Sequence, residues 1–418
     1  MFALVDANAF YCSAEQVFRP AWRAKAMIVL SNNDGCIVAA NKQAIALGIK
    51  KFQPFYKVRT LCENAGIIVC SSNYELYADL SHKMMQVIGR FAPQQHIYSI
   101  DESFLSFHNS QYAITDLAQH AQKIRRAVWK ETRLAVCVGI GKTLTLAKLA
   151  NHLAKKWPGF NGVCVLDDEH FKQQALAQLS PQDIWGIGRK TAHKLQQNGI
   201  TTAGQLSQLK PHHLPAGFNV ELHRTINELN GQPCKQWDQA RADKLQIFST
   251  RSLGKRITDI DSLKQVLAKH ASIAAVKARK QHSLCASLMV FAANSPFDKQ
   301  HCSYKILVSI HPATNNTVSL IKIINDNIHQ LYHQGVAYYK VGVGLLNLSS
   351  EAHQQWDLFT PAPENIPLMT VLDKINQRYG RDSAFLAAQG IDQKWSMRRE
   401  GLTPQYTTNW RHIPPIRC

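Results

Sequence analysis

The sequence has no apolar stretch long enough to cross a membrane. No run approaches the roughly 18 apolar residues of a spanning helix, and the first residues lack the basic segment and apolar core of a secretion signal. Ten cysteines are scattered without a C-x-x-C pair, and several, such as Cys137, lie in apolar runs typical of reduced core thiols. These absences argue against a membrane protein, a disulfide framework and a zinc site. We expect a cytoplasmic, nucleoid-associated protein with no membrane partner.

Acidic residues are few relative to basic ones. The 418 residues contain 29 Asp and Glu against 48 Lys and Arg, which gives a formal net charge of +19. This surplus predicts a polyanionic partner, because non-specific affinity for nucleic acids comes mostly from releasing the counterions around phosphates. An anionic membrane surface is the rival explanation. The length predicts two to four domains, at about 150 residues each.

Two adjacent carboxylates, Asp101 and Glu102, interrupt the segment from Ile97 to Leu105, which otherwise has strand character. Buried carboxylates are strongly disfavoured unless a cation meets them, and a metal is the obvious cation. Because neighbours in a regular strand point to opposite faces, a turn or bulge is expected here if both acids serve one metal site. The alternative is a surface hairpin with a solvated Asp-Glu tip.

A third carboxylate, Asp6, ends a short apolar strand and precedes residues with helical spacing. This is the position at which α/β folds usually place their ligand sites. Taken alone, a residue such as Asp6 is more often a helix-capping or turn residue. Together with Asp101 and Glu102 it could form a three-acid cluster that holds two hard divalent cations, which need several oxygen ligands.

The order of the predicted elements over residues 2–166 is β-α, an insertion, then α-β-β-α-β-α-β. Without the insertion this is an alternation of the split βαβ type, which predicts a sheet with helices on one side. Asp6 and the Asp101–Glu102 turn can then lie on neighbouring strands. Lys148 and Lys155 lie seven residues apart on a predicted helix that runs to about residue 157, so they share a face.

Two glycines, Gly186 and Gly188, stand in a pattern that resembles a helix-hairpin-helix. In that motif the glycines let backbone N–H groups at a helix start reach a DNA phosphate. The basic residues Arg189, Lys190 and Lys194 follow directly and favour a phosphate ligand. A tight interhelical turn without a ligand is the alternative.

A second, smaller α/β domain is predicted beyond a linker at residues 237–242. Its first strand carries Arg251, Lys255 and Arg256 around a glycine, and these residues are candidates for DNA contacts. The charges of this domain could also serve only solubility. The predicted elements are a helix at 264–280, strands at 285–292, 304–310 and 338–346, and a helix at 318–334.

The last 70 residues are richer in proline and polar residues and contain Gln355, Leu358 and Phe359 in a proline-flanked segment. Such a segment is typical of a docking peptide, in which the glutamine forms hydrogen bonds and the apolar pair fills a pocket. A packed loop is the alternative.

Several motifs in order resemble the Y-family translesion DNA polymerases. They are Asp6 before Ala-Asn-Ala-Phe-Tyr, Tyr-Ser-Ile-Asp-Glu ending at Glu102, and the Gly-Ile-Gly hairpin at 186–188. The segments 29–36, 72–79 and 185–189 are similar to the UmuC-like branch, which includes the catalytic subunit of bacterial DNA polymerase V. The resemblance extends over essentially the whole chain.

The resemblance implies a multidomain α/β (α+β) fold shaped as a right-hand polymerase with a ferredoxin-like split βαβ palm. The palm would comprise residues 1–12 and 76–166, with small fingers at 13–75. A helical thumb with the helix-hairpin-helix would follow at 167–236, then the linker, a separate α/β little-finger domain at 243–348 and a C-terminal tail at 349–418.

The resemblance also implies the ligands of two Mg²⁺ ions. Asp6, Asp101 and Glu102 would bind them, with the Ala7 carbonyl as a further ligand. Tyr11 aligns with the steric gate of the family, which stacks under the sugar and would clash with a ribose 2′-hydroxyl.

The nucleotide pocket would include further residues. Phe10 would line it, and Lys148 and Lys155 match palm lysines, with Lys155 near the incoming triphosphate. The fingers depart from the family pattern, because Ala40 and Ile45 stand where the UmuC-like branch commonly has basic residues. Lys42 lies nearby and is the substitute we expect, although an ammonium does not reproduce a guanidinium fork.

The implied activity is error-prone, template-directed DNA synthesis without proofreading, in translesion synthesis during the SOS response. The expected partners are primer-template DNA, dNTPs, a sliding clamp bound through residues 355–359, a UmuD-like accessory dimer and a RecA filament. Two rivals remain open: a nucleotide cyclase, which also carries paired acids on a split βαβ palm, and a non-catalytic DNA- and clamp-bound regulatory subunit.

Overall fold

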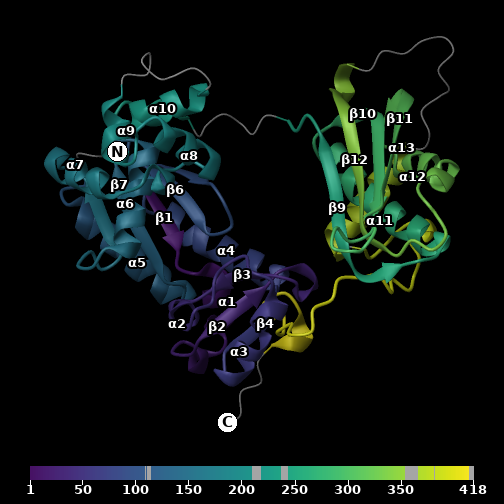
Figure 1. The fold of residues 1–418 in the computed structure, drawn as a ribbon, viewed down its shortest axis with the longest axis horizontal. Helices are drawn as coiled ribbons and strands as arrows, with labels where there is room; N and C mark the ends of the chain where they lie inside the picture. The colour runs from purple at the N-terminus through teal and green to yellow at the C-terminus, as the bar shows by residue number, and fades with distance from the viewer. Residues whose placement is uncertain are drawn as a thin grey trace. The chain divides into compact units, whose positions relative to one another are not determined.

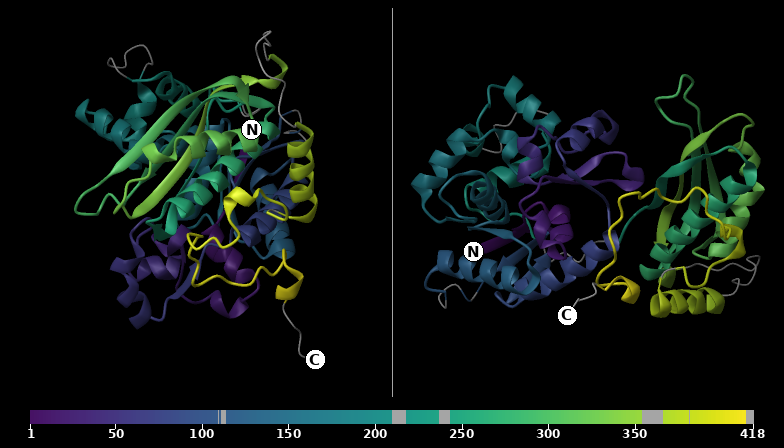
Figure 2. Two further views of the ribbon diagram at one scale, coloured as in Figure 1. Left: turned by 90° about the vertical axis from the view of Figure 1, so that its right-hand side faces the viewer. Right: turned by 90° about the horizontal axis from the view of Figure 1, so that it is seen from below.

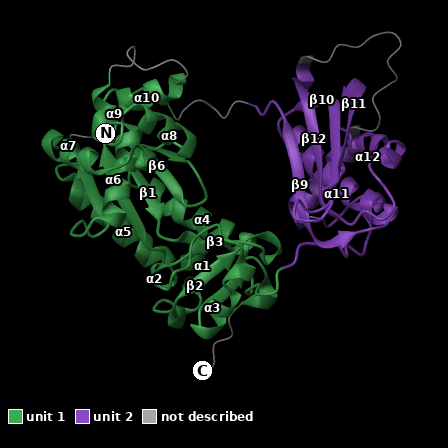
Figure 3. Cartoon of the chain, in the orientation of Figure 1, with its two compact units in different colours: residues 1–240, 399–418 green, residues 241–398 purple. Residues whose placement is uncertain are grey.

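The computed structural model describes residues 1–108, 110, 114–209, 218–236, 243–353, 366–380 and 382–413. The chain forms two compact units, residues 1–240 with 399–418 and residues 241–398 (Figure 3). Unit 1 therefore contains both the first and the last part of the chain, and unit 2 is inserted between them. In the described part of the chain, no helix is long and apolar enough to span a bilayer.

The largest sheet of unit 1 has five strands in the order β5-β6-β1-β7-β8, of which Figure 1 labels β6, β1 and β7. β1 is central and antiparallel to both neighbours, while β7 and β8 run parallel. This is the order expected for a split βαβ palm. The strands are β1 (Phe2–Ala7), β5 (Gln94–Ile97), β6 (Glu102–Ser106), β7 (Val136–Gly141) and β8 (Val163–Leu166).

Helices cover both faces of this sheet, so the prediction of helices on one side is wrong. Ala3 and Val5 of β1 pack in one core with helices α4 (Tyr74–Gly89) and α5 (Leu117–Thr132). Leu4, which points the other way, packs against Ala147 of helix α6 (Leu144–Lys156). The unpredicted layer forms because β7 carries glycines at 139 and 141, where the α6 backbone lies against the strand: a Cβ on Gly139 would meet the Asn151 nitrogen at 2.0 Å.

The insertion between β1 and α4 forms a small three-stranded sheet with the order β3-β2-β4. Its apolar residues make a separate core that includes Ile28, Ile37 and Ile49. The elements are α1 (Phe10–Val17), β2 (Met27–Leu30), β3 (Ile37–Ala40), α2 (Lys42–Ala46), α3 (Arg59–Asn64) and β4 (Ile68–Ser71).

Short helices follow β8 and form a third core of unit 1. They are α7 (Glu169–Gln178), the 3₁₀ turn η5 (Pro181–Asp183), α8 (Arg189–Gln197), α9 (Ala203–Gln208) and α10 (Val220–Leu229). Glu228 of α10 is fully buried and joins this layer to the start of α6. Its carboxylate accepts hydrogen bonds from the Thr145 N–H and hydroxyl at 2.9 and 2.7 Å and from the Cys234 and Lys235 N–H groups at 3.1 and 2.9 Å.

Unit 2 has a four-stranded antiparallel sheet with the order β11-β10-β12-β9. Alternate strand residues such as Val341 and Val343 pack against the long helix, which makes one face of the sheet the core of the unit. The second predicted helix is shorter than expected, because it ends at Asp326 and is followed by a 3₁₀ turn, Ile328–Gln330. The elements are β9 (Ile247–Ile257), α11 (Ile260–Lys280), β10 (Ser283–Ala293), β11 (Ser303–Thr314), α12 (Thr317–Asp326) and β12 (Tyr338–Ser350).

The C-terminal segment, shown in yellow in Figure 2, folds onto each unit in turn. Helix α13 (Ile366–Tyr379) is held on unit 2 by a bidentate ion pair between Arg279 and Asp373. From residue 399 onward the segment belongs to unit 1, where the N–H and carbonyl of Gly401 bond the hydroxyl and N–H of Ser71, both at 3.0 Å. The described residues of this segment thus belong to both units.

Candidate active site

The carboxylates of Asp6 and Glu102 lie side by side on one face of the large sheet. The two residues are direct partners in the antiparallel pairing of β1 with β6, so their side chains emerge on the same side. It is the side covered by α6, because Asp6 alternates with Val5, which faces the opposite core. Both side chains are mostly buried, with exposed fractions of 14% and 16%.

Helix α6 brings two lysines over this pair of acids. Lys155 forms an ion pair with Asp6, and the Lys148 Nζ lies 3.0 Å from Glu102 Oε2. Asn151, between them on the helix, donates to the Leu4 and Cys137 carbonyls at 3.2 and 2.9 Å and fixes α6 to the sheet. The predicted common face of the two lysines is confirmed, and a cavity of about 290 Å³ lies between these acids and lysines.

Burial raises the pKa of Asp6 to about 7. The Lys155 ammonium opposes this shift, while the nearby Glu102 carboxylate adds to it. The positive charge around Asp6 is therefore too small to offset the loss of water. A buried carboxylate with a raised pKa favours the binding of a further cation.

Asp101 lies in the turn between β5 and β6, as the interrupted strand pattern predicted. Its backbone carbonyl accepts a hydrogen bond from the Ala7 N–H at 2.9 Å, which ties the turn to the end of β1. Its carboxylate accepts one from the Ser99 hydroxyl at 2.6 Å. The same hydroxyl oxygen accepts the Glu102 N–H at 3.1 Å and shapes the hairpin.

The chemistry of these donors fits a hard divalent cation, although a complete metal cage is not formed. Carboxylate oxygens are the ligands that such ions prefer, and burial raises the pKa of Asp6 despite the nearby Lys155. In the described part of the chain, however, no three His, Cys, Asp or Glu side chains are grouped to hold a metal. The three-acid metal cluster therefore stays a prediction.

Aromatic rings gather beside the acids at the start of α1. The Tyr11 ring stacks on Tyr77 with a centroid distance of 4.7 Å and meets Tyr74 edge-on at 6.0 Å. Phe10, which is buried, meets Tyr77 at 6.4 Å. Burial raises the pKa of the Tyr11 hydroxyl, with Tyr74 and then Asp101 acting in the same direction, so this ring lies close to the acids.

The three predicted fingers residues differ in their exposure to solvent. Lys42 is the exposed first residue of α2, and Ile45 on the same helix is 50% exposed. Ala40 is buried in the core of the small sheet, so the side chain at this position points away from solvent.

The predicted helix-hairpin-helix has the expected turn. Gly186 has a φ of +89°, which an L side chain rarely adopts, and Gly188 is the N-cap of α8. Arg189 and Lys190 are exposed in its first turn. A 3₁₀ turn, η5, stands in place of a full helix immediately before the hairpin.

Next to this turn lies a cavity of about 710 Å³, whose walls include Tyr98, Trp185, Arg224 and Lys235. The ammonium groups of Lys148 and Lys235 lie 5.3 and 4.3 Å from the centroid of the Trp185 ring. Sequence reasoning missed Lys235, because one of its partners, Thr145, lies 90 positions away in the chain. This cavity is larger than the one at the acids, but the carboxylates lie in the smaller one.

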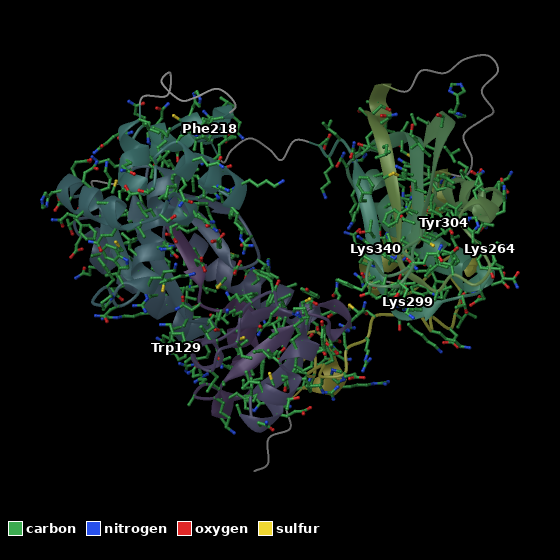
Figure 4. All side chains as sticks on the ribbon, viewed as in Figure 1. Trp129, Phe218, Lys264, Lys299, Tyr304 and Lys340 are labelled. Carbon is green, nitrogen blue, oxygen red and sulfur yellow. The ribbon has the colours of Figure 1, made fainter. Side chains whose placement is uncertain are left out.

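The candidate DNA-binding residues of unit 2 are exposed along β9. Lys255 is exposed, and Arg251 lies 3.8 Å from the Met397 sulfur. Arg256 forms a bidentate pair with Asp298 at 2.8 and 2.9 Å and is thus partly engaged within the unit. Lys340, labelled in Figure 4, lies on the neighbouring strand β12.

Two predictions from the sequence fall outside the described residues. They are the linker at 237–242 and the candidate clamp peptide with Gln355, Leu358 and Phe359.

The fold and this arrangement of residues define the class of protein. A solved Y-family DNA polymerase chimera of Dbh and Dpo4 matches 84% of this chain and 100% of its own, with a TM-score of 0.66 and 19% sequence identity. An insertion ternary complex of Dbh DNA polymerase matches the same shares with a TM-score of 0.54 and 20% identity. The chain has the fold of the Y-family DNA polymerases.

The sequence comparisons identify the family within this class. Residues 5–152 match the impB/mucB/samB family and residues 244–358 match its C-terminal domain. The chain is 38% identical to protein UmuC of Salmonella typhimurium and to protein MucB of Escherichia coli, over 99% of each chain. It is 24% identical to DNA polymerase IV 1 of Bacillus subtilis over 90% of each. The chain therefore belongs to the impB/mucB/samB family and is a UmuC-like member of the Y family.

A third match concerns the end of the chain. Residues 367–416 match a family described only as a domain of unknown function, DUF4113. It covers α13 and the segment that continues onto unit 1.

Proposed function

We propose that this protein is an error-prone, template-directed DNA polymerase that extends primers across damaged DNA in the SOS response. The observation that carries the proposal is the Asp6–Glu102 pair on adjacent strands, with Lys155 and Lys148 directly over it. The membership of the UmuC-like family supports it. The domain assignment is part of the proposal: palm at 1–12 and 76–166, fingers at 13–75, thumb at 167–236 and little finger at 243–348.

Asp6, Glu102 and Asp101 are the residues that would hold two Mg²⁺ ions, with the Ala7 carbonyl as a further ligand. When bound, such ions lower the pKa of the primer 3′-hydroxyl and neutralise the triphosphate for in-line displacement of pyrophosphate. Lys155 and Lys148 then lose their carboxylate partners. Their side chains are 29% and 23% exposed and are long enough to turn toward phosphate oxygens, with Lys155 assigned to the triphosphate.

Tyr11 is proposed to select the sugar. Its ring is backed by Tyr77 at 4.7 Å and held edge-on by Tyr74, so it cannot retreat from an added 2′-hydroxyl without moving this cluster. Phe10 fixes the same platform from the buried side. Lys42, exposed on α2, is the basic fingers residue that would meet the triphosphate.

Primer-template DNA is the proposed macromolecular substrate. The exposed N-terminus of α8, with Gly186 and Gly188 in the preceding turn and Arg189 and Lys190 in its first turn, suits a backbone phosphate. The positive residues of β9, Arg251, Lys255 and Arg256, would track the phosphates further along the duplex.

Protein partners are proposed from the family. Relatives are named UmuC, MucB and SamB, and a UmuD-like dimer and a RecA filament are the expected activators. The segment with Gln355, Leu358 and Phe359 is the proposed ligand of a sliding clamp.

The test is primer extension by the purified full chain with Mg²⁺ and all four dNTPs, in the presence of the accessory proteins. The Asp101→Asn variant should fall to background, and Asp392→Asn, a matched change at an exposed carboxylate of unit 2, should extend normally. Normal synthesis by the Asp101→Asn variant would refute the assignment. Wild-type protein that binds primed DNA without extending it would favour a regulatory subunit, for which the exposed Ile45 in the fingers is the specific observation.

A further inference from the structure

The end of the chain contacts the aromatic cluster through one threonine. Thr403 is buried, with 8% of its surface exposed, and its hydroxyl oxygen accepts a hydrogen bond from the Asn73 side-chain N–H at 3.0 Å. The same Asn73 amide also donates to the Thr403 and Pro404 carbonyls at 3.1 and 3.3 Å. Asn73 is fully buried and caps α4, the helix that carries Tyr77.

A buried carboxylate completes the connection. Glu15 is 1% exposed, and its Oε1 accepts the hydrogen bond of the Tyr77 hydroxyl at 2.7 Å. Its other oxygen, Oε2, is buried and has no partner at hydrogen-bond geometry among the described residues. Burial raises the pKa of Glu15, and the Tyr77 hydroxyl and then the nearby Thr403 act in the opposite direction.

The hydrogen-bond inventory assigns the Thr403 proton. A hydroxyl has one proton to donate, and its oxygen already accepts from Asn73. The acceptor that lacks a partner beside it is Glu15 Oε2. A hydrogen bond from the Thr403 hydroxyl to this oxygen, which the structure does not form, would satisfy the carboxylate, and leaving a buried carboxylate oxygen unsatisfied is costly.

The segment is well anchored on either side of Thr403. Before it, the Glu400 N–H donates to Asp34 at 2.9 Å and Gly401 pairs with Ser71. After it, the Tyr406 ring stacks on Phe18 with a centroid distance of 4.6 Å, and the Tyr406 hydroxyl accepts from Arg19 at 2.9 Å.

We propose that Thr403, within the domain of unknown function, is a positioning residue for sugar selection. It accepts a hydrogen bond from Asn73, which caps the helix that carries Tyr77. The Tyr77 hydroxyl is held by Glu15, and the Tyr77 ring backs Tyr11 at 4.7 Å. The proposal rests on the proposed role of Tyr11 as the sugar gate. Loss of the Thr403 hydroxyl allows the Tyr77 ring to shift. The Tyr11 ring can then move aside and accommodate the 2′-hydroxyl of a ribonucleotide.

The experiment compares kcat/KM for a dNTP and for the matching rNTP with full-length variants. The Thr403→Val variant keeps the shape but lacks the hydroxyl, and its preference for the dNTP should fall about three- to tenfold, the range set by one hydrogen bond. Thr403→Ser should restore the preference. Thr408→Val, the same change at an exposed threonine of this segment, should leave it unaltered. A purely structural defect would lower both kcat/KM values together and would leave their ratio constant.

The Tyr77→Phe variant keeps the ring and removes its hydrogen bond to Glu15, so it tests the same connection should Thr403→Val fail to fold. An unchanged ratio in both Thr403→Val and Tyr77→Phe, alongside a lost preference in Tyr11→Ala, would overturn the positioning role and leave the gate intact. An unchanged ratio in Tyr11→Ala would instead refute the gate, and the positioning role with it.

Discussion

Replacing Asp6 by Asn should stabilise the metal-free protein at neutral and alkaline pH. The folded state raises the pKa of this carboxyl from 3.8 to about 7, chiefly because burial disfavours its charge. An acid whose pKa is raised by folding binds more protons in the folded state, so stability is lost as the pH rises from the unfolded value through the folded one. The asparagine amide does not ionise and avoids this loss.

The size of the effect follows from the shift of the pKa. Each unit corresponds to about 1.4 kcal/mol, so the charge on Asp6 costs the folded state about 4 kcal/mol at pH 8. At pH 5 the folded carboxyl is still protonated and the cost is about 2 kcal/mol. The stability difference between Asp6→Asn and the wild type should therefore grow by about 2–3 kcal/mol between pH 5 and pH 8.

Urea unfolding in EDTA, followed by tryptophan fluorescence at several pH values, measures this difference. The Asp392→Asn variant, which removes a carboxylate that is 76% exposed, provides the control and should show no such trend. Addition of Mg²⁺ should stabilise the wild type and not Asp6→Asn, because a ligand of the folded state raises the free energy of unfolding. A constant difference between Asp6→Asn and the wild type from pH 5 to pH 8 would refute the reasoning about burial.

Three further predictions concern the frame of the site. Gly139→Ala should lower the free energy of unfolding by about 3 kcal/mol, because the new Cβ would lie 2.0 Å from the α6 backbone; an unchanged melting temperature would contradict the close packing. Glu228→Gln should lower the free energy of unfolding by about 1–3 kcal/mol, because the new NH₂ group would face an N–H donor of Thr145 or Lys235. Denaturant unfolding measures this change. Tyr11→Ala should incorporate ribonucleotides in primer extension, and retained sugar discrimination would exclude the gate.

Local patterns predicted the elements that build the site. The apolar strand before Asp6 and the interrupted strand at Asp101 gave the two neighbouring strands, because alternation and turns are encoded within a few residues. The seven-residue spacing of Lys148 and Lys155 predicted that both lie on one face of helix α6.

The parts that the sequence did not predict depend on contacts between distant residues. The layer formed by α6 follows from two glycines in β7, which read locally as ordinary strand residues. Glu228 meets Thr145 across 83 positions, and Thr403 meets Asn73 across 330. No periodicity within a segment specifies such partners. The hydrogen bonds of Glu228 and the contact of Thr403 with Asn73 could therefore not be predicted from the sequence.

The return of residues 399–418 to unit 1 has a consequence for synthesis of the protein. A ribosome makes the chain from its N-terminus, and domains generally fold as units while the chain emerges. Ser71 and Asn73 are translated some 330 residues before their partners Gly401 and Thr403. Unit 1 therefore cannot form these contacts until unit 2 has been translated, so a polypeptide terminated before Gly401 would lack them and be open to proteolysis.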